Sequence, residues 1–154
     1  MKYIAYGSNM SAEQMEYRCP DARLIDVGNI HGARLEFFIH ATVERSQIKD
    51  AFVPVAVWEI SERDEQRLDR YEGYPVYYGK EEWPVTMADG SELTGMIYLM
   101  RSKRGDMPTT GYYESIRSAY KDLGLRSEIK TVLEPALRRS MYRRFRLATG
   151  RRAK

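Results

Sequence analysis

The sequence predicts an α+β domain whose core is a small β-barrel or curled sheet with helices packed around it. Three observations support this fold class. Short segments rich in β-branched and aromatic residues follow one another through the first two thirds of the chain. Helical patterns interrupt them, and two such patterns close the chain. The length of 154 residues, with 43% hydrophobic and 31% charged residues, fits one globular domain with a single core.

In the N-terminal part, alternating and β-branched residues predict four strands. They are Lys2–Tyr6, Ala22–Val27, Arg34–Ile39 and Val53–Ile60. Ser11 is suited to cap a short helix, with Gln14 as its capping-box partner, and this helix should end near Arg18, before Pro20. Glycines predict a turn over residues 28–32.

In the second part, the pattern predicts three helices and one hairpin. A helix opens at Ser61 and ends at Gly73, a C-cap residue. The two hairpin strands, Tyr77–Met87 and Leu93–Met100, are joined by a turn at Asp89-Gly90. The remaining elements are a loop over Gly105–Thr110, a helix over Tyr112–Leu123 closed by Gly124, and a helix over Glu128–Leu147 with a kink at Pro135.

Composition excludes several classes of protein. No segment has the ~20 consecutive apolar residues of a membrane-spanning helix, and the first residues contain no secretory h-region. Cys19 is the one cysteine, which excludes an internal disulfide and fits a cytoplasmic location. His31 and His40 are too isolated for a zinc site, so we expect no metal and no cofactor.

Charge divides the chain unevenly. Eight of the 25 basic residues and none of the 22 acidic ones lie between Arg138 and Lys154, which leaves residues 1–137 with 17 basic and 22 acidic residues. The C-terminal helix is therefore basic and the body acidic. Such a helix could bind nucleic acid, but we favour a helix packed on the acidic body, with Tyr142 and Phe145 on its buried face.

A first candidate site is the segment Tyr6-Gly7-Ser8-Asn9-Met10, between a strand and a helix. Glycine permits a sharp turn and close approach of a ligand. Successive N–H groups near a helix N-terminus can bind an anion such as a carboxylate. The alternative is a plain strand-to-helix turn.

A second candidate is Glu72, in the segment Leu68-Asp69-Arg70-Tyr71-Glu72-Gly73. Its position at a helix C-terminus disfavours the negative charge, and the neighbouring tyrosines 71, 74, 77 and 78 could desolvate it further. Both effects raise the carboxyl pKa toward neutrality, as a general acid/base requires. The alternative is an exposed glutamate beside a C-cap glycine.

A third candidate is the segment Pro108–Tyr113, ahead of a helix. Two adjacent tyrosines can place one ring in the core and one hydroxyl over a pocket, although both could simply be packing residues.

Together the three segments resemble the gamma-glutamylcyclotransferase-like family. Its N-terminal signature is similar to residues 6–10, and its Leu-Asp-x-x-Glu-Gly pattern is similar to residues 68–73. Tyr78 looks like the tyrosine that opens the family's next strand, Ile97-Tyr98-Leu99 resembles a later core strand, and Pro108 and Tyr112 match its Pro-x-x-x-Tyr helix start. The match spans residue 1 to about Gly124. The family often has glycine at the position of Val55, where a side chain could narrow the pocket.

The resemblance implies a small mixed β-barrel flanked by helices, over residues 1–125, with the basic C-terminal helix, residues 126–154, as an addition. It implies an enzyme of the acyltransferase or lyase type that releases 5-oxoproline from a gamma-glutamyl amine, amino acid or peptide. Glu72 is then the catalytic acid/base. The residues expected to bind substrate are Tyr6, Gly7, Ser8, Asn9, Met10, Tyr78 and Tyr112.

Two other functions remain open. A small-molecule-binding module on the same fold could retain these motifs without turnover. Nucleic-acid binding through the C-terminal helix is the less favoured alternative. Because the resemblance ends before that helix, we expect the chemistry not to require it.

Overall fold

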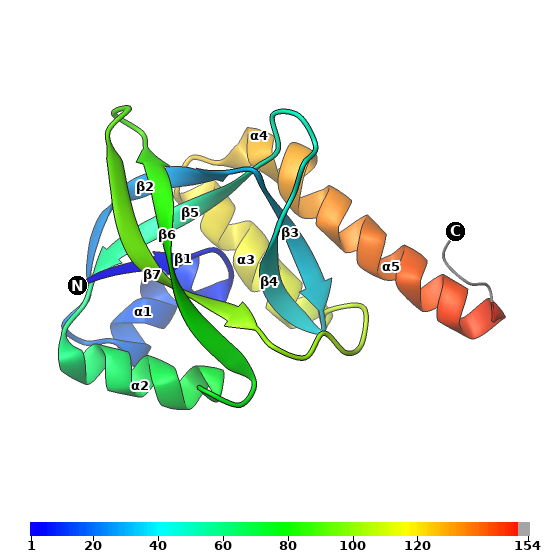
Figure 1. The fold of residues 1–154 in the computed structure, drawn as a ribbon, viewed down its shortest axis with the longest axis horizontal. Coiled ribbons are helices and arrows are strands. Elements are labelled where there is room, and N and C mark those ends of the chain that lie inside the picture. Colours follow the sequence, from blue (N-terminus) through cyan, green and yellow to red (C-terminus); the bar gives the residue numbers. More distant parts are fainter. Residues whose placement is uncertain (151–154) are drawn as a thin grey trace.

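A computed structural model describes residues 1–150 and has the predicted α+β architecture (Figure 1). Five strands close into a barrel in the order β1-β5-β2-β6-β7. They are β1 (Lys2–Ala5), β2 (Arg23–His31), β5 (Phe52–Glu59), β6 (Tyr78–Met87) and β7 (Glu92–Met100). Parallel pairing of β1 with β7, at Tyr3 and Met96, closes the barrel, and the other neighbours are antiparallel. The predicted mixed barrel is therefore confirmed.

A separate hairpin lies beside the barrel. It consists of β3 (Ala33–Phe38) and β4 (His40–Arg45), which pair from Ala33–Arg45 to Phe38–His40. The sequence predicted β3 but not β4. The turn at Ile39 has a φ of +66°, which β-branched residues rarely adopt, so no turn pattern marked it.

The turn predicted over residues 28–32 is largely wrong, because β2 continues to His31 and only Gly32 has a left-handed φ, of +67°. Gly28 serves close packing instead. It pairs with both Val55 and Met87, and a Cβ there would lie 2.6 Å from Cγ1 of Val85. Glycine at this position permits adjacent strands to approach, which sequence cannot distinguish from a turn.

Three helices cover the barrel, and the caps predicted at Ser11 and Gly73 are present. They are α1 (Ala12–Arg18), α2 (Glu62–Glu72) and α3 (Thr110–Asp122), and a short 3-10 turn, η1 (Ser8–Met10), precedes α1. Ser11 accepts from the Gln14 N–H, and Ser61 and Asp64 form a capping box at α2. Gly73 ends α2 with a φ of +64°. These caps fix where the residues after β1 and at the end of α2 lie.

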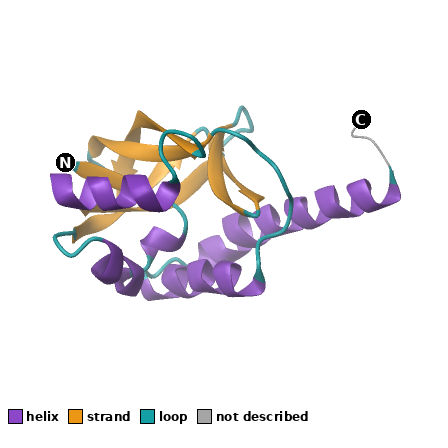
Figure 2. Ribbon diagram, turned by 90° about the horizontal axis from the view of Figure 1, so that it is seen from below, coloured by secondary structure: helices purple, strands orange, loops and turns teal. Residues whose placement is uncertain are grey.

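The C-terminal helical segment is continuous but not uniform. It comprises α4 (Arg126–Glu128), a π-helical turn η2 (Ile129–Leu133) and α5 (Glu134–Thr149). Pro135 lacks an N–H donor, and the widened turn lies just before it, where the sequence predicted a kink. Figure 2 shows α5 extending beyond the strands.

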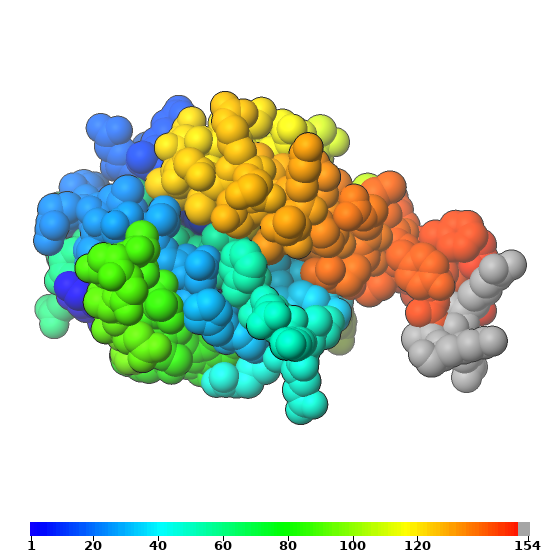
Figure 3. Space-filling view, turned by 90° about the horizontal axis from the view of Figure 1, so that it is seen from above, coloured from blue at the N-terminus to red at the C-terminus, as the bar shows by residue number. Residues whose placement is uncertain are grey.

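The end of α5 stands clear of the body, as Figure 3 shows. The prediction that Tyr142 and Phe145 form its buried face is wrong, since their side chains are 61% and 52% exposed. The helix instead contacts β3 through Arg139 and Arg143. No helix within residues 1–150 is long and apolar enough to cross a membrane.

Candidate active site

A cavity of about 560 Å³ opens between the barrel, the β3–β4 turn and the ends of two helices. Four segments supply most of its wall: the loop after β1, the C-terminal end of α2 with the start of β6, the turn from Phe38 to Ala41, and the start of α3. Of the residues predicted to bind substrate, six lie on this wall together with Glu72. They are Tyr6, Gly7, Ser8, Asn9, Tyr78 and Tyr112.

The loop after β1 leaves backbone donors unused at the cavity. Met10 donates its N–H to the Gly7 carbonyl at 3.0 Å. Within residues 1–150, no protein acceptor is found for the N–H groups of Gly7, Ser8 and Asn9. Three neighbouring backbone donors in one wall are the arrangement that binds a carboxylate or an oxyanion.

The side chains of this loop are fixed by the surrounding protein. The Asn9 side chain donates to the Tyr3 hydroxyl at 2.9 Å and accepts from Arg18 at 2.5 Å. The backbone carbonyl of Asn9 accepts from the Trp58 indole at 3.0 Å. The Tyr6 hydroxyl donates to the Tyr98 carbonyl at 2.5 Å. These bonds set the loop conformation, so its backbone, rather than the Tyr6 hydroxyl or the Asn9 amide, is free to meet a ligand.

Glu72 is partly buried where α2 ends at the cavity. Burial raises the pKa of its carboxyl from the usual 4.5 to about 7, and the positive charge of Arg18 opposes this shift. No hydrogen bond to the carboxylate contributes. A carboxyl with a pKa near neutrality can both accept and donate a proton at physiological pH.

The tyrosines near Glu72 do not all lie as expected. Tyr71, Tyr77 and Tyr78 line the cavity with Glu72, whereas Tyr74 lies outside this wall, with its ring 4.3 Å from the Lys80 amine. Of the four, Tyr78 is the buried one. Desolvation of Glu72 therefore comes from the cavity wall as a whole rather than from the sequence neighbours alone.

Tyr78 and Tyr112 both form a hydrogen bond with Ala41, a residue of the cavity wall. The Tyr78 hydroxyl donates to the Ala41 carbonyl at 2.9 Å, and the Ala41 N–H donates to the Tyr112 oxygen at 3.1 Å. The Tyr112 oxygen would also lie 3.4 Å from a Cβ added at Gly7. Both tyrosines thus join the β3–β4 turn to the rest of the site, and the Tyr112 hydroxyl proton remains available for another acceptor.

Two residues considered at the sequence level lie away from the cavity. Met10 is 1% exposed and packs into the core beneath the loop. Val55 is buried in the barrel at 0% exposure and is not part of the cavity wall, so its side chain does not narrow the cavity.

The structure adds residues that the motifs did not single out. Tyr3 and Tyr98 line the cavity, and their rings contact edge to face at 5.9 Å. Arg18 binds the loop through Ser8 at 3.2 Å and Asn9, and its guanidinium lies 3.6 Å from the centre of the Tyr71 ring. Tyr98 lay within a family-like strand pattern, but nothing in the sequence marked Arg18.

The charges around the cavity are unequal. Arg70, Arg104 and His40 lie on its wall, and Glu72 is the one acidic residue there among the residues described. Within residues 1–150, no group of three or more His, Cys, Asp or Glu side chains is placed to hold a metal ion.

The fold is thus that of an α+β protein with a closed five-stranded barrel, and Glu72 lies on the wall of a cavity beside it. The model of the family "Gamma-glutamyl cyclotransferase, AIG2-like" matches residues 3–115. The chain belongs to this family, and the predicted assignment to an enzyme family is confirmed.

Known relatives agree with this assignment. The mouse protein gamma-glutamylcyclotransferase is 29% identical over 143 residues, covering 86% of this chain and 76% of the relative. The human gamma-glutamylcyclotransferase is 27% identical, with the same coverage. A solved structure of a gamma-glutamyl cyclotransferase superposes with a TM-score of 0.77 at 27% identity, covering 86% of this chain and 85% of the other.

Proposed function

We propose that this protein is a cyclotransferase that releases 5-oxoproline from gamma-glutamyl compounds, with Glu72 as its general acid/base. The observation that carries the proposal is a carboxyl of raised pKa on the same cavity wall as three backbone donors that have no acceptor within residues 1–150. Family membership supports the reaction class.

The reaction needs no nucleophile from the protein. The α-amine of the substrate attacks its own γ-carbonyl carbon, a C–N bond forms and closes the five-membered ring, and the original amide C–N bond breaks. Holding the substrate in the folded conformer that brings amine and carbonyl together supplies a large part of the acceleration. A cavity of about 560 Å³ has room for a gamma-glutamyl compound in this conformer.

Glu72 performs both proton transfers in this proposal. Its carboxylate takes a proton from the α-ammonium group, which frees the lone pair for attack, and the resulting carboxylic acid gives a proton to the departing amine. The ring nitrogen then loses its second proton, which the same carboxyl passes on to the amine, so that the amine leaves as an ammonium ion. With a pKa of about 7, both forms are populated near neutral pH. One carboxyl therefore suffices, and it returns to its starting state after each turnover.

The loop supplies the electrostatic part. The N–H groups of Gly7, Ser8 and Asn9 bind either the α-carboxylate of the substrate or the oxyanion that develops at the γ-carbon. The hydrogen bonds that Asn9 makes with Tyr3, Arg18 and Trp58 hold these donors in place before the substrate arrives. Tyr78 and Tyr112 line the same cavity and both bond to Ala41.

The remaining charges favour a leaving group that carries a carboxylate. Arg70 and Arg104 are exposed cations on the cavity wall. A gamma-glutamyl amino acid or peptide presents a carboxylate near the departing nitrogen, whereas a gamma-glutamyl amine does not. We therefore place amino acids and peptides ahead of simple amines as leaving groups.

Release of 5-oxoproline from a matched pair of substrates tests the function. The pair is gamma-glutamyl-alanine and gamma-glutamyl-ethylamine, which differ chiefly in the leaving-group carboxylate. Turnover of at least one member supports the reaction, and preference for the first supports the role of the arginines. If neither member nor a broader panel of gamma-glutamyl compounds is cyclised, while 5-oxoproline still binds, the protein is a binding module on this fold.

A further inference from the structure

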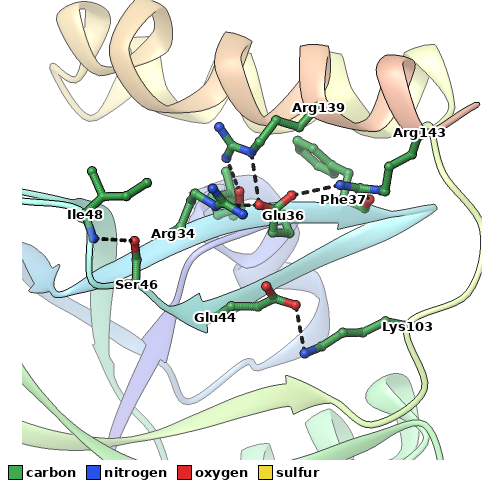
Figure 4. Close-up of polar contacts among 10 residues, drawn as sticks. Arg34, Glu36, Phe37, Glu44, Ser46, Ile48, Lys103, Arg139 and Arg143 are labelled. Atoms are coloured by element: carbon green, nitrogen blue, oxygen red, sulfur yellow. Dashed lines mark hydrogen bonds and ion pairs between the residues drawn. The ribbon is translucent and has the colours of Figure 1, made fainter. Parts of the chain in front are cut away.

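Glu36 carries a charge in an unusual place. This residue of β3 is 1% exposed, and three arginines surround its carboxylate (Figure 4). Arg34 and Arg139 contact Oε1 at 2.7 Å and 3.0 Å, and Arg143 contacts Oε2 at 3.1 Å. A buried carboxylate is tolerated only when it is paired and hydrogen-bonded in this way. Two of its three partners come from α5, outside the family-matched residues 3–115.

The same two arginines also bind the backbone of β3. Arg139 donates to the Leu35 carbonyl at 2.6 Å, and Arg143 donates to the Phe37 carbonyl. Carbonyls two residues apart on a strand point to the same edge, and β3 has β4 as its one strand partner within residues 1–150. The two side chains of α5 therefore occupy the open edge of β3.

The end of β3 forms part of the cavity wall. The guanidinium of Arg143 lies 4.3 Å from the ring centre of Phe38, which lines the cavity. Ile39, His40 and Ala41 follow on the same wall. Ala41 is the residue to which Tyr78 and Tyr112 both bond. Arg143 is thus separated from the candidate active site by one ring.

A second contact joins α5 to the segment between β7 and α3. Arg144 lies 3.9 Å from the Asp106 carboxylate and 3.7 Å from the sulfur of Met107. The Asp106 carbonyl accepts from the Ile39 N–H at 3.0 Å. The helix therefore touches both chain segments that lead into the β3–β4 side of the cavity.

From these contacts we propose that Arg139 and Arg143 are positioning residues that hold the cavity wall of residues 38–41 in its binding conformation. The idea replaces the expectation that the chemistry does not require the C-terminal helix. This proposal rests on the proposed function only where it is tested by enzyme kinetics. A purely structural role predicts a different result, namely lower stability of the whole fold with an unchanged cavity in the folded molecules.

Matched single variants separate the two roles. Arg139→Gln and Arg143→Gln remove one contact each with Glu36 and β3, and Arg143→Lys keeps the charge but loses the forked geometry. Arg138→Gln is the control, because Arg138 is an exposed arginine of the same helix and makes the same change in net charge. Thermal unfolding first establishes that each variant is folded under the assay conditions.

Hydrogen exchange tests the proposal without an activity assay, because it measures how often the N–H groups of residues 38–41 open to solvent. We expect the N–H groups of Ile39 and Ala41 to exchange at least about fivefold faster in Arg139→Gln and Arg143→Gln than in the wild type, while the N–H groups of the β6–β7 hairpin keep wild-type rates. In Arg138→Gln, all of these groups should exchange at wild-type rates. Unchanged exchange over residues 38–41, or an increase shared equally by the barrel, overturns the proposal.

Kinetics then tests the consequence for the site. The KM for a gamma-glutamyl substrate should rise about fivefold or more in Arg143→Gln with a smaller change in kcat, and Arg143→Lys should fall between this variant and the wild type. Equal KM values in all variants contradict the proposal. If the wild type itself does not turn over, the Kd for 5-oxoproline replaces KM, so that failure of the proposed function is recorded separately.

Discussion

The hydroxyl of Tyr98 donates a hydrogen bond of 2.6 Å to the carboxylate of Asp69, three residues before Glu72 on α2. The same carboxylate lies 2.7 Å from the amine of Lys80 on β6. The Tyr98 carbonyl in turn accepts from Tyr6, in the loop after β1. Asp69 thus links the helix that carries Glu72 to two barrel strands, and through Tyr98 to the loop after β1.

Removing the hydroxyl of Tyr98, which bonds to Asp69, should lower the stability of the fold without disturbing its packing. We expect Tyr98→Phe to lower the free energy of unfolding by about 1–2 kcal/mol, because Asp69 loses its neutral partner but keeps Lys80. Urea denaturation measures the change. Tyr142→Phe, on the exposed part of α5, is the control and should have no effect. Equal midpoints for both variants would show that the bond contributes nothing.

The raised pKa of Glu72 predicts a stability that falls as pH rises. The folded protein binds this proton with a pKa of about 7, against 4.5 for the free side chain, so folding favours the protonated form. The resulting penalty appears as pH increases from about 4.5 to about 7 and is then constant. It can reach about 3 kcal/mol, at ~1.4 kcal/mol per pKa unit, and solvent near the cavity makes it smaller.

Glu72→Gln isolates this effect, since the amide does not titrate. The variant should be more stable than wild type by about 1–3 kcal/mol at pH 8, and the two should be nearly equal at pH 4.5. Urea unfolding at both pH values measures it. A variant that is less stable at pH 8 would mean that the carboxylate is stabilised in the folded protein and that its pKa is not raised.

The loop after β1 should bind an anion through particular N–H groups. We expect 5-oxoproline or sulfate to shift the amide resonances of Gly7, Ser8 and Asn9, and to leave that of Met10 largely unchanged because its N–H already bonds to Gly7. Titration followed by NMR, or a crystal soak, makes the measurement. An anion that binds only at Arg70 or Arg104 would show that the loop after β1 is not the anion-binding site.

Substrate preference should depend on the arginines of the cavity wall. Arg104→Gln is expected to raise the KM for gamma-glutamyl-alanine by roughly 3–10-fold and to leave the KM for gamma-glutamyl-ethylamine unchanged, because only the first has a leaving-group carboxylate. Arg101→Gln, an exposed neighbour outside the cavity wall, is the control. Equal losses for both substrates would assign Arg104 to the shared glutamyl part instead.

Sequence could predict those parts of the fold whose signals are local. The caps at Ser11, Ser61 and Gly73, and the Asp89-Gly90 turn, each depend on a few adjacent residues, and all are present in the structure. The same holds for the site. The loop after β1 and the end of α2 are recognisable segments, and closure of the barrel brings them to one cavity.

The features that sequence missed depend on distant contacts. Gly28 looked like a turn residue because its role is set by Val85 across the sheet. Phe145 looked like a core residue because helical spacing does not reveal where the body ends beneath α5. Glu36 lies in a predicted strand, and two of its three arginine partners, Arg139 and Arg143, lie more than a hundred residues away. No local pattern contains that information.

The most direct test of the account is the rate of 5-oxoproline release by wild type and Glu72→Gln. General acid/base groups typically supply ~10²–10⁴-fold in rate, so kcat should fall by at least about a hundredfold, with binding of 5-oxoproline largely retained. Wild-type kcat/KM should also rise with pH through about 7, as the carboxylate forms, and this step should be absent from the residual activity of the variant. Comparable rates for the two proteins would contradict the central claim that Glu72 moves the proton.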